Sequence, residues 1–313
     1  MAAERVLISE VGPRDGLQNC ADIMPTAQKK AWISALAEAG VREIEVGSFV
    51  SKKLLPQMAD TGEVVEYATT IAGLEVAVLV PNLKGAQMAV AAGAHKITLP
   101  LSVSETHSLR NIRRTHDQVI AEARAITTFL DSLPTGERPH FEGSLSTAFG
   151  CTLEGVVPEA TILRCAERLV DAGCDEVGIS DTTGYGDPTS VKKLIRAVRG
   201  AVGTDKVMGV HLHNTRGLGL ANALAAYEEG ISTFDSSLGG LGGCPTAPGA
   251  SGNIVSEDLV FMFEAMGVAT GIDIDRLMAT REIVAAALPK EELYGFTPRA
   301  GLPLDFQPTS EAA

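Results

Sequence analysis

Residues 163–183, LRCAERLVDAGCDEVGISDTT, contain the unit that decides the fold. A run of helical period ends at Ala172, Gly173 follows it, and a β-rich run then covers residues 176–180. Glycine just past a helix takes the left-handed conformation of a C-cap without strain, which suits a turn from a helix into a strand. The same small hinge stands at residues 39–41 and 92–94. This recurrence predicts successive strand–helix units.

Eight β-rich runs alternate with longer runs of helical period. The expected strands cover residues 5–11, 42–47, 74–80, 95–99, 140–147, 176–180, 207–213 and 233–237. The expected helices cover residues 26–39, 84–92, 117–129, 158–172, 188–202, 218–229 and 257–266. This alternation is typical of a parallel sheet with crossover helices. We therefore predict an α/β fold, a (β/α)₈ TIM barrel over residues 1–290, with a C-terminal helical or irregular extension over residues 291–313. The alternative is a series of Ala/Gly-rich loops without a shared architecture, and eight strands with matched turns argue against it.

The composition excludes several classes of protein. With 313 residues, 45% of them hydrophobic, the chain can bury a large core, and its 21% charged residues argue against disorder. The net charge of -13 argues against a nucleic-acid partner, because phosphate binding needs clustered Lys and Arg. No apolar run is long enough for a membrane span, and the first residues do not resemble a signal peptide. The 5 scattered cysteines form neither a disulfide framework nor a CxxC site, which predicts a reducing, cytoplasmic location.

Polar residues stand where the predicted strands end. Arg14 and Asp15 follow the first strand, Asp181 ends the sixth, and the seventh ends with His211 and His213. In a (β/α)₈ barrel the reacting groups sit at the C-terminal ends of the strands, which meet at one rim. The sequence therefore predicts an active site at this rim.

The pair His211 and His213 is the most informative pattern. Residues i and i+2 of a strand point to the same face, so both imidazoles should project into the barrel mouth. The seventh strand neighbours the eighth, and the eighth closes against the first, which brings Asp15 and the loop after the eighth strand close to the histidines. Two imidazoles, a carboxylate and an amide oxygen suit Mg²⁺ or Mn²⁺ better than a thiolate-rich zinc site does. Taken alone, an HxH pair is more often structural or hydrogen-bonding, and the placement of Asp15 favours a metal site.

Two segments resemble the signature regions of 3-hydroxy-3-methylglutaryl-CoA lyases. They are VGPRDGLQN at residues 11–19 and GGCPTAPGASGN at residues 242–253. Further matches lie between them in the same order: IEVGSFVS (44–51), VPNLKG (80–85), FGC (149–151) and SDT (180–182). The resemblance covers roughly residues 5–290, nearly the whole predicted barrel. The cysteine-centred Gly loop is specific to this family, whereas the HxHN segment alone indicates the wider group of metallolyases and condensing enzymes.

The resemblance implies a role for each matching residue. The residues that match metal ligands, here for Mg²⁺ or Mn²⁺, are Asp15, His211, His213 and Asn253. Arg14 matches the arginine that polarises the thioester carbonyl and stabilises the enolate, and Cys244 matches the catalytic cysteine of a mobile loop, a candidate for proton delivery. Glu45 and Asp181 match acidic residues important to catalysis. Contacts with the substrate are expected from Arg14, Gln18, Asn82 and Ser146, and also from Arg216, a positive charge near the mouth that the family pattern lacks.

The activity that the resemblance implies is the cleavage of hydroxymethylglutaryl-CoA to acetyl-CoA and acetoacetate. It also implies an acyl-CoA partner, a homodimer and a place in leucine catabolism. The 3-hydroxyl proton must leave while an enolate develops on the departing acyl-CoA. A divalent cation lowers the pKa of the hydroxyl, and a fixed guanidinium stabilises the enolate.

Other interpretations of the same residues stay open. Cys244 could be an ordinary buried thiol, Glu45 and Asp181 could be structural ion-pair partners of Arg14, and Asn82 is typical of a turn or rim. Residues 239–243 could cradle a phosphate, but no GK[ST] follows, and a flexible lid is expected instead. The remaining cysteines are predicted to be structural.

The sequence also departs from the family pattern. Asn19 is followed by Cys-Ala where the family commonly has Glu, the second histidine is followed by Asn-Thr-Arg-Gly in place of Asp-Thr-Tyr-Gly, and the Gly-Cys pair at residues 150–151 is followed by Thr-Leu in place of Pro-Tyr. These changes leave a related substrate such as citramalyl-CoA open. A condensing acyltransferase of the isopropylmalate-synthase type is a second alternative, and a non-catalytic barrel is a third.

Overall fold

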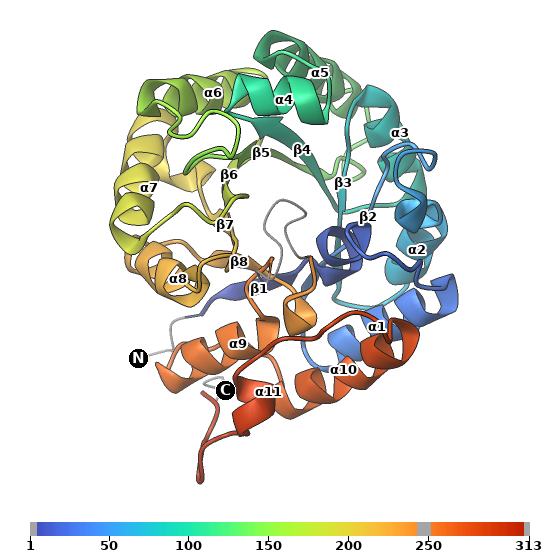
Figure 1. Cartoon of the computed structure of the whole chain (residues 1–313). Coiled ribbons are helices and arrows are strands. Elements are labelled where there is room, and N and C mark those ends of the chain that lie inside the picture. The colour runs from blue at the N-terminus through green and yellow to red at the C-terminus, as the bar shows by residue number, and fades with distance from the viewer. Residues whose placement is uncertain (1–4, 243–251, 310–313) are drawn as a thin grey trace.

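The computed structural model describes residues 5–242 and 252–309, and its centre is a closed barrel of parallel strands in sequence order (Figure 1). The strands are β1 Leu7–Glu10, β2 Glu43–Ser48, β3 Glu75–Leu79, β4 Lys96–Ser102, β5 His140–Ser146, β6 Glu176–Asp181, β7 Gly209–Leu212 and β8 Thr233–Ser236. Each predicted strand overlaps an observed one. The predicted (β/α)₈ barrel is therefore confirmed.

Helices form a ring outside the strands (Figure 1). They are α1 Thr26–Glu38, α2 Thr61–Ala68, α3 Leu83–Ala92, α4 Glu105–Asn111, α5 His116–Leu130, α6 Glu159–Asp171, α7 Pro188–Val202, α8 Gly219–Glu228, α9 Ser256–Ala265, α10 Ile274–Ala287 and α11 Thr297–Ala300. Short helical turns are η1 Gly12–Gly16, η2 Pro56–Met58, η3 Thr204–Lys206 and η4 Leu238–Gly240. The sequence patterns predicted neither α2, α4, α10 nor α11. Three of these have fewer than nine residues, too few to establish a helical period.

The first and last strands close the barrel. β1 pairs with β8 in parallel, from Leu7 opposite Thr233 to Glu10 opposite Ser236. β7 in turn pairs with β8, with His211 opposite Asp235. Closure therefore brings the C-terminal ends of β1, β7 and β8 together, as the predicted topology requires.

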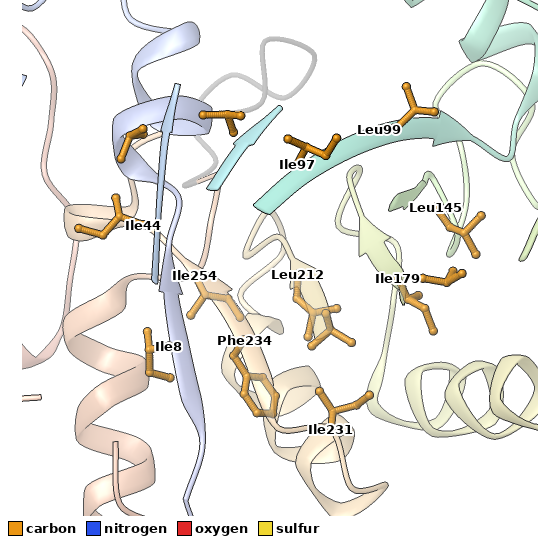
Figure 2. Close-up of a cluster of buried hydrophobic side chains, with 14 of the residues drawn as sticks. Ile8, Ile44, Ile97, Leu99, Leu145, Ile179, Leu212, Ile231, Phe234 and Ile254 are labelled. Carbon is orange, nitrogen blue, oxygen red and sulfur yellow. The ribbon is translucent and has the colours of Figure 1, made fainter. Parts of the chain in front are cut away.

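The main apolar core lies between the strands and the helices. Ile8, Ile44, Ile97 and Phe234 come from four different strands and are 0–2% exposed (Figure 2). Because side chains alternate along a strand, the residues on either side of each point into the lumen instead. Trp32 of α1 is fully buried in the same core. Burial of this apolar surface is the main favourable term in folding.

The predicted glycine hinges take left-handed backbone conformations. The φ angle is 101° at Gly40, 87° at Gly93 and 98° at Gly173. Gly173 also leaves no room for a side chain, because a Cβ there would lie 2.7 Å from Thr127 Oγ1. The residue that repeats at the helix-to-strand turns is thus required by backbone conformation, and this part of the prediction is confirmed.

The C-terminal region packs outside the barrel. α10 lies against α1, and α9 lies near β1 and β8 (Figure 1). The backbone N–H groups of Phe296 and Thr297 donate to the Asp258 carboxylate of α9, at 2.7–3.0 Å. The Phe306 ring lies 5.3 Å from that of Phe261. The boundary at residue 290 stays a prediction.

Within residues 5–242 and 252–309, no helix combines the length and apolar character needed to cross a membrane.

Candidate active site

A cavity of about 520 Å³ opens where the strands end. Most of the residues that the sequence singled out reach it. Those that line it are Arg14, Asp15, Gln18, Glu45, Ser146, His211 and His213. Of the polar residues predicted to share this rim, Arg14, Asp15, His211 and His213 line the cavity, whereas Asp181 does not.

A single π-turn, η1, positions Arg14 and Asp15. The N–H of Gly16 donates to Val11 O at 3.3 Å, which closes the turn directly after β1. Gly12 starts the turn and cannot carry a side chain, because a Cβ there would lie 2.9 Å from both the Ser237 hydroxyl and the Trp32 ring. The tight turn directs two consecutive side chains into the same cavity.

Asp15, His211 and His213 converge. One ligand atom from each lies within 4.8 Å of those of the other two. The two histidine Nε2 atoms are 3.0 Å apart, and His211 Nε2 lies 4.0 Å from Asp15 Oδ2. The juxtaposition inferred from strand order is confirmed.

These three side chains fit a divalent cation. Neighbouring ligands in octahedral coordination at about 2.1 Å lie roughly 3.0 Å apart, which matches the spacing of the two imidazole nitrogens. His213 Nδ1 is buried and has no hydrogen-bond partner among the residues that the structure describes. That nitrogen lies on the opposite side of the ring from Nε2, so the spacing of the Nε2 atoms and the donor set carry the fit to a cation. The donor set of one carboxylate and two imidazoles can therefore hold a metal ion.

Asp235 orients His211, a contact that the sequence analysis missed. Its Oδ2 lies 3.0 Å from His211 Nδ1. A carboxylate at this nitrogen keeps the proton on Nδ1 and leaves the Nε2 lone pair free for a cation. The available signal was the alternation of β8, which turns the residue between Phe234 and Ser236 into the lumen.

Asn253 lies beside the same cluster. Its Nδ2 donates to Asp15 Oδ2 at 2.8 Å and to Leu241 O at 3.0 Å. A backbone bridge also joins it to His213. The amide predicted as the fourth ligand is thus brought to the other three, and its coordination of a metal stays a prediction.

Arg14 is held by two carboxylates. Its Nε and Nη2 both lie 2.5 Å from Glu45 Oε2, and its Nη1 lies 2.6 Å from Asp15 Oδ1. Asp181 does not join this pair, since it accepts the backbone N–H groups of Tyr185 and Gly186, each at 2.9 Å. Glu45 is therefore an ion-pair partner of Arg14, whereas Asp181 holds the loop after β6.

The environment of the site shifts the pKa values of its acids and imidazoles in different directions. Burial alone would raise the pKa of Asp15, but Arg14 and the two histidines outweigh it and hold the pKa at about 2. Burial raises the pKa of Glu45 to about 7 despite its contact with Arg14. Burial and the neighbouring His211 lower the pKa of His213 to about 4. Near neutral pH the cluster therefore offers an ionised Asp15 and a neutral His213, the forms that bind cations.

The residues predicted to contact substrate divide into two groups. Gln18 and Ser146 line the cavity, and Gln18 Nε2 donates to Asp15 Oδ1 at 2.7 Å. Asn82 caps α3 by accepting the N–H of Gly85 at 3.0 Å, so its interpretation as a turn residue is supported. Arg216 is exposed and stacks on the Tyr185 ring at 4.7 Å.

The cysteines also divide into two groups. Cys244 lies outside the described residues, so its predicted role stays a prediction. The four that the structure describes are free and buried, in agreement with a structural role: Cys20, Cys151, Cys165 and Cys174.

Comparison with known proteins identifies relatives along the barrel. The model of the HMGL-like family matches residues 5–284. The mitochondrial hydroxymethylglutaryl-CoA lyase of Arabidopsis thaliana is 42% identical over 283 residues, covering 90% of this chain and 59% of that protein's length. The mitochondrial hydroxymethylglutaryl-CoA lyase of Gallus gallus is 40% identical over 292 residues, covering 91% of this chain and 94% of its own length.

A solved structure has the same fold. It is an HMG-CoA lyase from Acinetobacter baumannii in complex with coenzyme A and 3-methylmalate. The TM-score is 0.89 at 40% sequence identity, and the alignment covers 97% of each chain.

Proposed function

The chain belongs to the HMGL-like family, and from this membership we propose that it is a carbon–carbon lyase that cleaves hydroxymethylglutaryl-CoA to acetyl-CoA and acetoacetate. The observation that carries the proposal is the convergence of Asp15, His211 and His213 beside Arg14, at the mouth of a barrel about 40% identical to hydroxymethylglutaryl-CoA lyases.

Mg²⁺ or Mn²⁺ is the proposed cation. Asp15, His211, His213 and the Asn253 amide would hold it, since carboxylate, imidazole and amide oxygen are ligands suited to these ions. When bound, the ion orients the substrate and lowers the pKa of its 3-hydroxyl. Asp235 keeps the His211 ring in position for this task.

Arg14 stabilises the leaving enolate in this proposal. The C2–C3 bond breaks, its electrons pass into the thioester, and negative charge develops on the thioester oxygen. Because hydrogen bonds to Glu45 and Asp15 hold the guanidinium in place, it does not have to reorganise as negative charge develops on the thioester oxygen. The hydroxyl proton passes from O3 to water, and C2 takes a proton for which Cys244 is the proposed donor. Water then returns a proton to the thiolate. Atoms and charge then balance in the two products.

One of the three departures from the family pattern touches the cavity. Thr152 and Leu153 line its mouth, whereas Arg216 does not. Thr152 and Leu153 therefore stand on the proposed entry path of the substrate. For this reason the related substrate citramalyl-CoA is included in the test. The identity of about 40% to hydroxymethylglutaryl-CoA lyases favours the first substrate and argues against a condensing transferase.

The proposal is tested by steady-state cleavage of both thioesters by the purified full chain with Mg²⁺. We expect acetyl-CoA release from hydroxymethylglutaryl-CoA, with its kcat/KM exceeding that for citramalyl-CoA. His211→Ala and Cys244→Ser should each remove most of the activity. A larger kcat/KM for citramalyl-CoA would show that citramalyl-CoA, and not hydroxymethylglutaryl-CoA, is the substrate. Cleavage of neither thioester would refute the proposal. The homodimer, a cytoplasmic location and a role in leucine catabolism stay predictions.

A further inference from the structure

The deep end of the cavity is charged. The lumen of a (β/α)₈ barrel is usually packed with bulky branched apolar side chains. Here the cavity continues downwards past Ser9 and Ala77 to Glu43, Lys96 and Glu142, which all line it. We call these last three residues the charged floor.

The charged floor lies at the N-terminal ends of its strands. Glu43 is the first residue of β2, Lys96 the first of β4, and Glu142 the third of β5. Lys96 Nζ lies 2.9 Å from Glu142 Oε2 and 3.6 Å from Glu43 Oε1. The side chains of Glu43, Lys96 and Glu142 are only 8%, 10% and 15% exposed. The charged floor therefore has little contact with bulk solvent and faces the cavity.

The neighbouring strand makes room for this cluster. Glu142 packs against Gly178 of β6, where any Cβ would collide with the Glu142 carboxylate. Burial alone would lower the pKa of Lys96, but Glu142 and Glu43 outweigh it and hold the pKa well above its usual value. The charged floor thus keeps its cation across the neutral range.

The charged floor is close to the proposed chemistry. Glu45, which holds Arg14, and Glu43 are two residues apart on the lumen side of β2, roughly 7 Å along the strand. An acyl group held at Arg14 therefore reaches the charged floor within a few carbon atoms.

We propose that the charged floor determines acyl specificity, by admitting short polar acyl groups and excluding alkyl tails. This inference rests on the proposed function, because it assumes an acyl-CoA in this cavity. A carboxylate or hydroxyl end can share hydrogen bonds with Lys96 and the water around it. An alkyl end displaces that water and gives the buried charges no replacement partner.

The test compares the affinities of acetyl-CoA and hexanoyl-CoA, measured by calorimetric titration of the full chain. In the wild type we expect the longer chain to bind no more tightly. The double substitution Lys96→Met with Glu142→Leu keeps the net charge and removes two of the three charged side chains of the floor, leaving Glu43. This variant should raise the affinity for hexanoyl-CoA, relative to that for acetyl-CoA, by at least tenfold. The reason is that each buried methylene contributes roughly a fourfold gain in affinity.

Two controls separate this effect from general destabilisation. Lys30→Met with Glu63→Leu removes an ion pair of the same residue types, 2.7 Å apart, between α1 and α2 on the outside of the barrel, and should keep the wild-type ratio. Lys96→Arg keeps the floor charged and should keep that ratio as well.

Two outcomes would overturn the inference. One is an unchanged affinity ratio in a folded Lys96→Met, Glu142→Leu variant. The other needs no variant: a steady gain in wild-type affinity with each added methylene from acetyl- to octanoyl-CoA. If the protein binds acyl-CoAs but does not cleave hydroxymethylglutaryl-CoA, the lyase proposal is refuted and the inference is not. The inference is tested by the ratio of the two acyl-CoA affinities.

Discussion

The two faces of the barrel sheet have opposite chemistry, and adjacent residues of β8 show the contrast. Phe234 faces outwards, 1% exposed, with its ring 4.9 Å from that of Phe263 in α9. Asp235 faces inwards, and its carboxylate meets His211. One peptide bond separates a residue that stabilises the fold from one that serves the site.

The contrast shows how the chain keeps stability and chemistry apart. Because successive side chains of a strand point to opposite faces, the residues of one face can differ in chemistry from those of the other. Apolar burial on the outer face supplies the folding free energy, so the lumen can hold charges that contribute little to stability or oppose it. Substitutions on the two faces should therefore have separable effects.

The largest effect is expected on the inner face, from His211→Ala. We expect kcat/KM to fall by at least about 10³-fold, because the variant loses one proposed metal ligand. The free energy of unfolding should change by less than about 1 kcal/mol, since the imidazole lies in a polar cavity. Steady-state kinetics and urea unfolding measure the two quantities. A variant that unfolds more easily yet keeps its activity would contradict the separation.

The opposite result is expected on the outer face, from Phe234→Ala. Removing the buried ring should lower the free energy of unfolding by about 3–4 kcal/mol, through lost burial and a cavity beside Phe263. The kcat/KM per folded molecule should stay within about threefold of the wild type. Urea unfolding followed by circular dichroism provides the first value, and kinetics at a temperature where the variant is folded provides the second. A 100-fold loss of activity in the folded variant would show that the two faces are coupled.

A smaller effect is expected from Asp235→Asn, next to Phe234 in the chain. The amide can still contact His211 Nδ1 but lacks the charge that orients the ring. Loss of such a contact weakens metal affinity by about 10–100-fold. The Mg²⁺ or Mn²⁺ concentration that gives half-maximal activity should rise by that factor, with unchanged unfolding in the metal-free protein. An unchanged metal requirement would remove Asp235 from the site.

The smallest effect concerns Glu10, an acid buried on the apolar side. Burial raises its pKa to about 8, although the Ser256 hydroxyl and the N–H groups of Leu238 and Gly12 donate to it. The folded state keeps a proton that the unfolded state releases. The stability from Glu10 is thus greatest below about pH 4.5 and falls as the pH rises to about 8.

Glu10→Gln mimics the protonated acid and should remove this pH dependence. Relative to the wild type, it should gain roughly 1–1.5 kcal/mol between pH 5 and pH 6. Urea unfolding at several pH values measures the difference. A constant offset between the two proteins across this range would mean that Glu10 does not titrate there.

The part of the site that depends on strand order could be predicted from the sequence. The i, i+2 spacing of His211 and His213, with the closure of β8 on β1, was enough to place Asp15 beside them. Glycine hinges likewise predicted turns, because their left-handed backbone is a local requirement.

Contacts between distant side chains could not be predicted in the same way. Lys96, Glu43 and Glu142 stand near the starts of strands, where charged residues usually face solvent. Their burial depends on small residues elsewhere, such as Gly178, whose role is visible only in three dimensions. Glu45 and Asp181 were assigned together from the sequence, and their partners differ because one faces Arg14 and the other faces backbone.

Asp15 and Asn253 hydrogen-bond across 238 positions of sequence. A nascent chain on the ribosome therefore carries the first of the proposed metal ligands almost from the start of synthesis, but has no site until β8 has been made and docked on β1. An ion bound at this site could therefore not guide the early steps of folding. An ion at the proposed site would instead stabilise the closure of a long loop late in folding, so metal occupancy would report that synthesis has passed residue 253 and that the barrel has closed.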